Sequence, residues 1–299
     1  MANNSFPAGL YVAATPIGHL DDISQRVRDA LTRCDRIYAE DTRRTQALLH
    51  ALGIARDRTV LHALHEHNEY TVRDDVIAAI EHGASVLMVS DAGTPAISDP
   101  GFLVVDAAWA HGIPISPLPG PSAVITALSV CGFARWPMCF WGFAPAKASA
   151  RRSWLENLAS TGGLAVIFEA PHRADASLTD CAAVFGDSTP MLYARELTKQ
   201  HETLLRGSIR DIQHRVAEHQ RQDPGAAKGE MVWVFDLGEK KTVSADHAQL
   251  MAWADALRGE MPAANAAKCL MKMCGVTRDE AYQAILGRPI SGVSPYAPD

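Results

Sequence analysis

Carboxylates, prolines and glycines follow an apolar run in the segment VLMVSDAGTPAISDPG, residues 86–101. The apolar residues 86–89 predict a buried strand, and in open α/β sheets ligands bind just beyond the carboxyl ends of strands. The glycines allow backbone conformations that are closed to other residues, and the prolines stiffen the turns between them. The pattern predicts a loop that presents backbone and carboxylate groups to a ligand. The alternative is a structural connection in which Asp91 and Asp99 cap turns or a helix.

Two common nucleotide motifs are missing from the sequence. Neither G-x-G-x-x-G nor G-x-x-x-x-G-K-[ST] occurs, so a dinucleotide-dependent oxidoreductase and a P-loop nucleotide hydrolase are not supported. His62, His65 and His67 lie close together but lack the H-E-x-x-H spacing. No set of histidines and carboxylates around them completes a zinc site, and we expect no metal.

Apolar runs alternate with helical patterns in the first 120 residues. This alternation predicts βαβ units and a mostly parallel sheet. Thr94 and Ser122 follow strands that we expect to be neighbours in that sheet. The passage Gly132–Pro145 is rich in Gly, Trp and Pro and predicts a domain boundary. The strands are expected at 10–14, 35–39, 59–61, 86–90 and 115–118, and the helices at 23–34, 72–82 and 102–111.

The second half of the chain predicts a mixed α/β domain whose strands are separated by only two convincing helices. The close spacing within residues 190–206 indicates an antiparallel pair. We therefore divide the chain into an N-terminal α/β domain at 8–120, a mixed α/β domain at 121–240 and a helical tail at 245–290. The strands of the second domain are expected at 138–141, 164–168, 190–194, 202–206 and 230–236.

The tail has the pattern of a helix, a glycine turn and a second helix. Residues 263–273 favour a helix, Cys274-Gly275-Val276 interrupts it, and Thr277 with Glu280 predicts a capping box at the start of the next helix. This arrangement is typical of a helix-turn-helix. Its balanced charge leaves open whether it touches RNA or supports packing or a dimer.

The composition and charge of the chain limit the classes of protein to which it can belong. With 299 residues, 47% of them hydrophobic, the chain can build two compact domains. No apolar run approaches a membrane span and no leader precedes one, so we expect a cytoplasmic protein without membrane contact. The six cysteines form no regular framework and are expected to be thiols. The net charge of −6 lies in residues 1–120, so RNA contacts would need local basic clusters.

Further segments carry distinctive residues and accompany the loop SDAGTP in order along the chain. Together they resemble the ribosomal RNA small subunit methyltransferase I family, within the tetrapyrrole methylase superfamily, over roughly residues 8–290. The resemblance implies two α/β domains with a cofactor cleft between them and a helical tail. The segments are TPIGHLDDIS at 15–24, AEDTRRT at 39–45, PLPGPSA at 117–123, FEAPHR at 168–173 and KGE at 228–230.

The resemblance implies that S-adenosylmethionine is the cofactor. Such a ligand needs an apolar slot for adenine, polar groups for the ribose and amino-acid ends, and room around a cationic sulfonium. Ser122 and Ala123 open a helix whose N–H groups suit the methionyl carboxylate, although Ser122 alone also fits a helix cap and Phe168 a core aromatic. The cofactor contacts carried over are Pro16, Asp91, Ala92, Gly93, Thr94, Ile97, Ser122, Ala123, Phe168, Glu169, Ala170, Gly229 and Glu230.

The methyl acceptor implied by the resemblance is the ribose 2′-hydroxyl of one cytidine in the decoding centre of 16S ribosomal RNA. A hydroxyl nucleophile needs a base or a stabiliser for the developing oxyanion. Glu40, Asp41, Glu169 and His172 are candidates, while Glu40 and Asp41 could instead form ion pairs with nearby arginines. The sequence does not choose among them.

Basic residues near these motifs are candidate phosphate contacts, although each could equally be part of an ordinary solvated surface. The resemblance adds the small ribosomal subunit as partner and a homodimer as assembly. Two other interpretations remain: a methylase of a tetrapyrrole intermediate, and a noncatalytic RNA-binding assembly factor. The candidate RNA contacts are Arg43, Arg44, Lys147, Arg151, Arg152 and Arg173.

Overall fold

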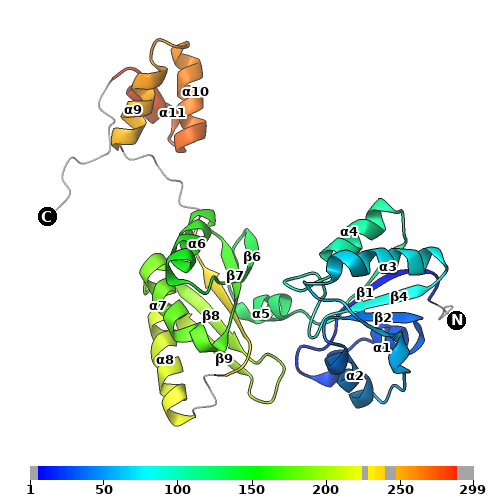
Figure 1. Cartoon of the computed structure of the whole chain (residues 1–299). Coiled ribbons are helices and arrows are strands. Elements are labelled where there is room, and N and C mark those ends of the chain that lie inside the picture. Colours follow the sequence, from blue (N-terminus) through cyan, green and yellow to red (C-terminus); the bar gives the residue numbers. More distant parts are fainter. Residues whose placement is uncertain (1–5, 224–227, 240–246, 288–299) are drawn as a thin grey trace. The chain divides into compact units, whose positions relative to one another are not determined.

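The computed structural model describes residues 6–223, 228–239 and 247–287. Its contacts divide the chain into two compact units, residues 1–158 with 163–238, and residues 159–162 with 239–299. Both β-sheets belong to the first unit and the C-terminal helices to the second (Figure 1). This division keeps both sheets together, so a boundary between two α/β domains near residue 120 stays our proposal.

The N-terminal sheet is five-stranded in the order β3-β2-β4-β1-β5, and every pairing in it is parallel. The predicted parallel α/β sheet is thereby confirmed. Helices connect the strands, as parallel crossovers require. The strands are β1 Gly9–Ala13, β2 Arg36–Ala39, β3 Leu61–Ala63, β4 Ser85–Val89 and β5 Ile115–Leu118, and the helices are α1 Gln25–Arg33, α2 Thr42–Ala51, α3 Glu69–Glu81 and α4 Phe102–Ala110, with short 3-10 turns η1 Leu20–Asp22 and η2 Arg58–Val60.

Helices cover both faces of this sheet (Figure 1). Leu10 and Met88 pack with α3 and α4, whereas their chain neighbours Tyr11 and Leu87 pack with α1 and α2. Side chains alternate between the faces of a strand, so burial on both faces demands continuous apolar runs. Polar chemistry is therefore confined to the ends of the strands.

The second sheet is five-stranded in the order β6-β7-β10-β8-β9. Only β6 and β7 are parallel; the pairing of β8 with β9 is antiparallel, as the spacing of residues 190–206 predicts. Helices α6, α7 and α8 pack on one face and α5 on the other. The strands are β6 Met138–Phe143, β7 Leu164–Glu169, β8 Pro190–Arg195, β9 Thr203–Ser208 and β10 Met231–Asp236, and the helices are α5 Ala123–Cys131, α6 Ala148–Thr161, α7 Ala174–Phe185 and α8 Ile209–Gln222, with a 3-10 turn η3 Pro171–Arg173.

The order of strands in the N-terminal sheet corrects one expectation. The strands before Thr94 and Ser122 were expected to be neighbours, but β1 lies between β4 and β5 and pairs with both. The first strand of such a sheet commonly takes a central place because the chain winds outward from it in both directions. Thr94 and Ser122 consequently lie on either side of the end of β1.

Local patterns also differ from the observed elements. The strand expected at 59–61 is mostly a 3-10 turn, because the Asp57 carboxylate accepts a hydrogen bond from Thr59 N at 2.9 Å and starts the turn. Helix α2 was not expected; it begins at the N-cap Asp41, inside the segment AEDTRRT at 39–45. The mixed sheet carries α6, α7 and α8 where only two helices were expected. The expected boundary passage contains β6.

The C-terminal unit contains α9 (His247–Leu257), α10 (Ala263–Cys274) and α11 (Arg278–Ile285) around an apolar core of its own. The capping box is confirmed: Glu280 N donates to Thr277 Oγ1 at 3.3 Å and Thr277 N donates to Glu280 Oε2 at 2.7 Å. The helix before this pair, α9, was not expected. The predicted start of the tail at residue 245 lies outside the described residues. No described helix is both long and apolar enough to cross a bilayer.

Deletion of the C-terminal unit tests whether the two sheets fold without it. A chain that ends at Gly238 retains every strand, so we expect it to fold and to melt within about 5 °C of the parent. Far-UV circular dichroism measures the melting, and the near-UV signal of the buried Trp233 reports the packed core. A loss of that near-UV signal would mean that the tail is part of the core.

Candidate active site

The carboxyl ends of β1, β2 and β4 lie level at one edge of the N-terminal sheet. Val89 pairs in parallel register with Ala13 on one side and Ala39 on the other. The segments that follow these strands therefore start side by side. Thr15 N donates to Gly93 O at 2.8 Å, and Gly93 N donates to Thr15 O at 3.0 Å. This pair of bonds closes the loop after β4 onto the loop after β1.

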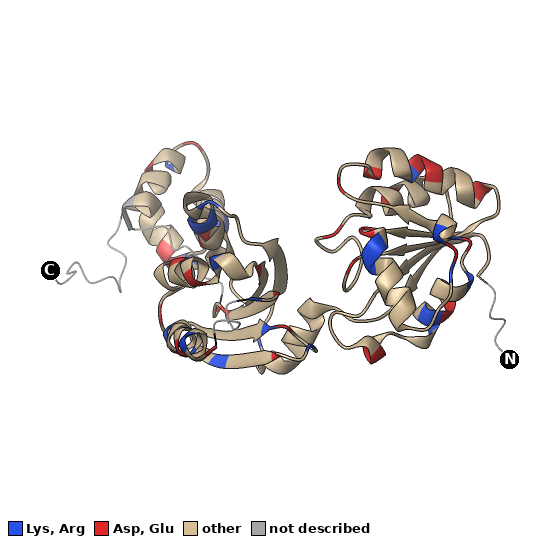
Figure 2. Cartoon of the chain, turned by 60° about the horizontal axis from the view of Figure 1, so that its bottom comes forward, with Lys and Arg blue, Asp and Glu red and all other residues tan. Residues whose placement is uncertain are grey.

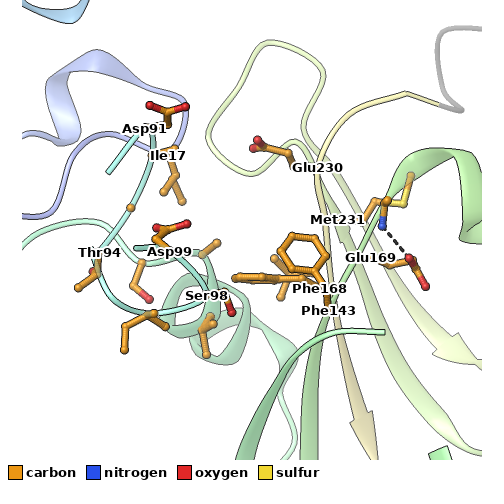
Figure 3. Close-up of a pocket in the computed structure, with 18 of the residues that line it drawn as sticks. Ile17, Asp91, Thr94, Ser98, Asp99, Phe143, Phe168, Glu169, Glu230 and Met231 are labelled. Carbon is orange, nitrogen blue, oxygen red and sulfur yellow. Dashed lines mark hydrogen bonds between the residues drawn. The ribbon is translucent and has the colours of Figure 1, made fainter. Parts of the chain in front are cut away.

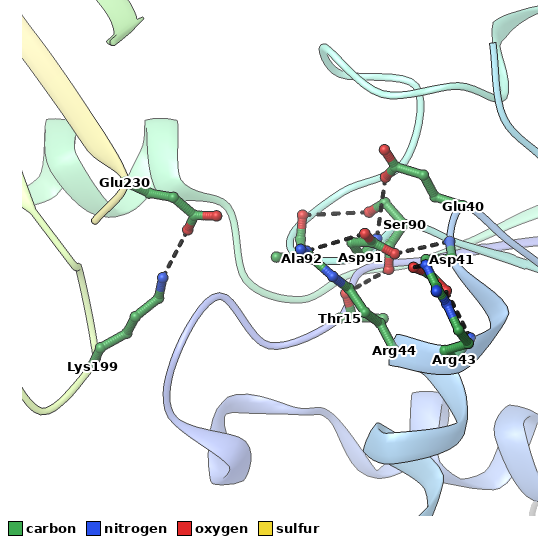
Figure 4. A network of polar contacts seen from close by, with 10 residues as sticks. All are labelled: Thr15, Glu40, Asp41, Arg43, Arg44, Ser90, Asp91, Ala92, Lys199 and Glu230. Carbon is green, nitrogen blue, oxygen red and sulfur yellow. Dashed lines mark hydrogen bonds and ion pairs between the residues drawn. The ribbon is translucent and has the colours of Figure 1, made fainter. Parts of the chain in front are cut away.

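Asp91 ties the same edge together (Figure 4). Its Oδ1 accepts a hydrogen bond from Asp41 N at 3.0 Å, and its Oδ2 lies 3.1 Å from Arg44 Nη1. The Arg43 guanidinium and backbone N–H both bond to Asp41 and hold its pKa well below the usual range. Asp41 is therefore an ionised helix cap that is paired with Arg43. The sequence left this pairing open as the alternative to a role as the base.

A cavity of about 330 Å³ opens beside this edge (Figure 3). The loop after β4 forms one wall. The last residues of β6 and β7 and the first residues of β10 form the other. Its volume falls within the range of about 300–1,000 Å³ that is usual for small-molecule sites. The lining residues are Ile17, Glu40, Arg44, Asp91, Ala92, Gly93, Thr94, Ile97, Ser98, Asp99, Ser122, Ala123, Val124, Phe143, Phe168, Glu169, Ala170, Pro171, Glu230, Met231 and Val232.

The cavity gathers all of the predicted cofactor residues except Pro16 and Gly229. Pro16 lies next to the lining residue Ile17. Gly229 has a φ of +96°, and a Cβ added to it would come within 2.6 Å of the Glu196 side chain. Only glycine fits there, so Gly229 shapes the turn that presents Glu230 to the cavity.

Part of the apolar lining was not predicted from the sequence, although Ile97 and Phe168 were. Phe143 and Phe168 meet edge to face with their ring centroids 5.2 Å apart, and Figure 3 shows both rings at the cavity. Met231 and Val232 continue this wall from β10. The sequence offers one signal, because Met231 directly follows the Gly229-Glu230 motif. Phe143 gives none, since it looks like any aromatic residue of a strand.

Carboxylates from separate segments converge on the cavity. Burial, followed by the nearby charge of Glu40, raises the pKa of Asp99 to about 6, although the hydroxyl of Ser90 works in the opposite direction. Burial and the charge of Asp91 raise the pKa of Glu40. Glu230 forms a 2.9 Å ion pair with Lys199. The sequence left Asp99 as a possible cap, but the N–H groups at the start of α4 bond to Glu69 instead.

Glu169 forms part of the cavity wall while its carboxylate is turned into the protein. Its side chain is fully buried, and its Oε1 accepts from Ala170 N at 2.7 Å and pairs with Arg173 Nη2 at 2.8 Å. A carboxylate held in this way fixes the turn between β7 and η3. Glu169 and Arg173 are thus placed as a structural pair, neither as a base open to the cavity nor as a solvent-facing phosphate contact. His172 is exposed and outside the cavity lining.

Helix α5 begins at the cavity with Ser122 as its N-cap residue. The Ser122 side chain makes no capping hydrogen bond to the helix in the described structure. The helix N-terminus therefore keeps N–H groups that suit an anionic ligand group. Thr94 Oγ1 donates to Pro121 O at 3.3 Å and holds the loop after β4 against this helix start.

The basic residues at the start of α6 and directly before it separate into two kinds. Arg151 is buried, with its Nη2 2.6 Å from Asp180 Oδ2, and it also bonds to the backbone of Pro145. Arg152 pairs with the same Asp180 at 2.7 Å but is 59% exposed, and Lys147 is exposed. The expected RNA contact at Arg151 is corrected to a structural ion pair, because breaking a buried pair leaves an uncompensated charge.

Comparison with known proteins places the chain in a family. The sequence profile of the Tetrapyrrole (Corrin/Porphyrin) Methylases matches residues 9–213, which contain both walls of the cavity except the strand β10. The chain belongs to the tetrapyrrole methylase family. It is accordingly a methyltransferase that uses S-adenosylmethionine, and the predicted fold class, enzyme class and cofactor are confirmed.

Several curated relatives of this methylase carry the name ribosomal RNA small subunit methyltransferase I. The protein of Xylella fastidiosa (strain Temecula1) is 42% identical over 93% of this chain and 99% of its own length. The protein of Escherichia coli O157:H7 is 38% identical over 93% of this chain and 94% of its own length. The protein of Mycobacterium tuberculosis (strain CDC 1551) is 44% identical over 68% of this chain and 71% of its own length.

Solved structures show the same fold at low sequence identity. Uroporphyrin-III C-methyltransferase of Thermus thermophilus is 15% identical with a TM-score of 0.52, over 77% of this chain and 94% of its own. Diphthine synthase is 14% identical with a TM-score of 0.55, over 76% of this chain and 88% of its own.

The cavity of this methylase suits the cofactor by its chemistry. S-adenosylmethionine combines a flat apolar base with a cationic sulfonium, an ammonium and a carboxylate. Phe143, Phe168 and Met231 supply an apolar wall, and Asp91 and Glu230 supply carboxylates opposite or beside it (Figure 3). The start of α5 offers N–H groups for the carboxylate. These residues would hold the cofactor.

Filling the start of α5 tests this placement. Ser122→Trp puts a bulky ring into the cavity lining, and we expect the affinity for S-adenosylmethionine to fall by about 100-fold or more. Isothermal titration calorimetry measures the affinity. Ser129→Trp is the matched control, because Ser129 lies on the same helix, is exposed and is not part of the lining. A folded Ser122→Trp protein with parental affinity would place the cofactor elsewhere.

Proposed function

We propose that this chain methylates 16S ribosomal RNA in the small ribosomal subunit, at the 2′-hydroxyl of a cytidine ribose in the decoding centre. The observation that carries the proposal is the 42% identity to a protein named ribosomal RNA small subunit methyltransferase I, over 93% of this chain and 99% of the relative. A match of that kind extends over almost the whole chain, and it is not confined to one wall of the cavity. We also propose that the protein is a cytoplasmic homodimer.

Methyl transfer to a hydroxyl requires alignment, exclusion of water and removal of a proton. S-adenosylmethionine supplies the methyl group when bound. The rings of Phe143 and Phe168 cover one side of the cavity and limit the entry of water there. Carboxylates on the other side of the cavity favour S-adenosylmethionine over the product that remains after methyl transfer, because this product no longer carries the sulfonium charge. This difference favours exchange of product for fresh cofactor.

RNA contacts are proposed for basic side chains that are exposed near the cavity. Figure 2 shows Lys and Arg interspersed with Asp and Glu along the ribbon of the described chain. Local groups must then hold the phosphates. Arg43 is 89% exposed at the start of α2, Arg44 lines the cavity and is 68% exposed, and Lys147 follows the lining residue Phe143 by four positions. Arg152 completes the set beside Lys147.

Two other functions are less well supported. A tetrapyrrole acceptor is suggested by the name of the family and by solved structures that are 15–17% identical. The fold that these proteins share does not by itself specify the acceptor. A noncatalytic RNA-binding factor would have no need of a cavity of about 330 Å³ lined by aromatic rings and carboxylates. The RNA methyltransferase therefore remains the function that the observations support best.

Transfer of label tests the acceptor. We expect tritiated methyl groups from S-adenosylmethionine to enter the RNA of purified small ribosomal subunits, since the relatives bear that name. Digestion to nucleosides should place the label in 2′-O-methylcytidine. Tetrapyrrole precursors serve as the competing acceptor in parallel reactions. Label in a tetrapyrrole, in another nucleoside or in no acceptor at all would refute the proposed function.

Charge reversal at Lys147 tests the RNA surface separately from the cofactor site. Lys147→Glu should weaken binding to small subunits about tenfold and make the salt dependence of log K shallower by about 0.7–0.9 for each phosphate that the protein no longer neutralises. Arg221→Glu on α8 is the control, because it makes the same kind of charge change at an exposed site outside the cavity lining. Filter binding at several salt concentrations measures both effects. A parental salt slope combined with reduced cofactor affinity would contradict this assignment.

A further inference from the structure

The carboxylates around the cavity differ in what neutralises them. Asp91 is paired with Arg44 at 3.1 Å and also accepts a backbone N–H. Glu230 is paired with Lys199 at 2.9 Å. Asp99 has no Lys, Arg or His within ion-pair distance among the described residues. Paired carboxylates are poor proton acceptors because protonation would break the pair.

Glu40 is the other carboxylate of the cavity that has no ion pair with a described residue, and it is held differently from Asp99. Its Oε2 lies 3.5 Å from Asp91 N, and the positive charge of Arg44 acts on it. Figure 4 shows Glu40 beside the loop after β4, with its carboxylate directed at the backbone there. Glu40 therefore helps to hold the loop, whereas Asp99 is not engaged by a cation.

The backbone around Asp99 is forced into an unusual conformation. Ala96 and Ser98 both have positive φ angles, 64° and 65°, and Ala96 N donates to Pro100 O at 3.3 Å across the turn. Gly101 closes the turn with φ +125°, where a Cβ would lie 2.8 Å from Met88 Sδ. Residues held in sparsely populated conformations cost stability and cluster at functional sites. Here the strained turn presents Asp99 to the cavity (Figure 3).

We infer that Asp99 is the catalytic base of methyl transfer, an inference that rests on the proposed hydroxyl acceptor. A lone pair of the 2′-oxygen forms the new C–O bond to the methyl carbon. The C–S bond breaks and its electron pair stays on sulfur, which becomes a neutral thioether. The hydroxyl proton passes to the Asp99 carboxylate and leaves to solvent when the product departs. The step needs no oxidant, reductant or metal.

The surroundings of Asp99 support this role electrostatically. The charged groups that face it are Glu40 from the end of β2, Asp91 from the loop after β4 and Glu230 from before β10, with Arg44 on the same cavity wall. Burial and these negative charges raise its pKa to about 6. A base is most effective when its pKa is raised toward the working pH while it is still ionised there. Asp99 is ionised above about pH 6 and protonated below it.

The test compares Asp99→Asn with Glu40→Gln in single-turnover methyl transfer between pH 5 and 8.5. The parent rate should fall as the pH drops below about 6, because Asp99 becomes protonated. Asp99→Asn should lower the rate about 100- to 1,000-fold and abolish this fall, while affinity for S-adenosylmethionine changes less than about threefold. Glu40→Gln should keep this fall of the rate at low pH, which is the acid limb of the pH profile. Asp106→Asn, exposed on α4, is the control and should behave as the parent.

Thermal unfolding without cofactor shows whether Asp99→Asn is folded. The pKa of Asp99 is above its usual value in the folded protein, so ionising it as the pH rises through about 6 removes stability. Asp99→Asn should therefore melt above the parent at pH 8 and with the parent near pH 4. This readout depends on burial at the site and not on any RNA.

Three results would overturn the assignment of Asp99. They are a parental rate in Asp99→Asn, an acid limb that persists in it but vanishes in Glu40→Gln, and a loss confined to cofactor affinity. All variants are measured on whichever acceptor the parent protein methylates. An acceptor other than ribosomal RNA would thus refute the proposed function. The rates of Asp99→Asn and Glu40→Gln on that acceptor would still show which of the two carboxylates is the base.

Discussion

Parallel pairing of β1, β2 and β4 in one level register is the constraint on which the site depends. Because Val89 lies opposite both Ala13 and Ala39, three segments leave the sheet at the same height and can bond to one another. The Thr15–Gly93 backbone pair and the Asp91 carboxylate then join them. A shift of one residue in any pairing would turn these side chains to the opposite face.

The two walls of the cavity contribute different physical properties because they come from different sheets. The N-terminal sheet is buried on both faces, so its polar groups gather at the strand ends, where Glu40, Asp91 and Asp99 lie. The mixed sheet ends in aromatic and apolar side chains, among them Phe143 and Phe168. A ligand with a flat apolar ring and a positive charge matches both walls, which agrees with the cofactor of the family.

Buried ion pairs stabilise the second wall of the cavity. Glu169 and Arg173 fix the turn after β7, and Arg151 with Asp180 joins α6 to α7. Burial opposes ionisation of Asp180, but the guanidinium groups of Arg151 and Arg152 lower its pKa. Such pairs are weak sources of net stability, and removal of one partner is costly because a buried charge remains. They hold the loops in place for the groups that face the cavity.

Local patterns in the sequence were enough to predict the parallel sheet, the antiparallel pair within residues 190–206, the capping box at Thr277 and the loop after residue 89 that lines the cavity, because each follows from local periodicity or turn chemistry. Which charged groups are paired and which are exposed follows from the packing of the folded chain. Arg151 and Arg152 are neighbours in sequence, yet one turns inward to Asp180 and the other stays exposed. Asp99 looked like a possible cap and instead faces the cavity. Ion pairing and burial depend on partners far along the chain, which local patterns do not specify.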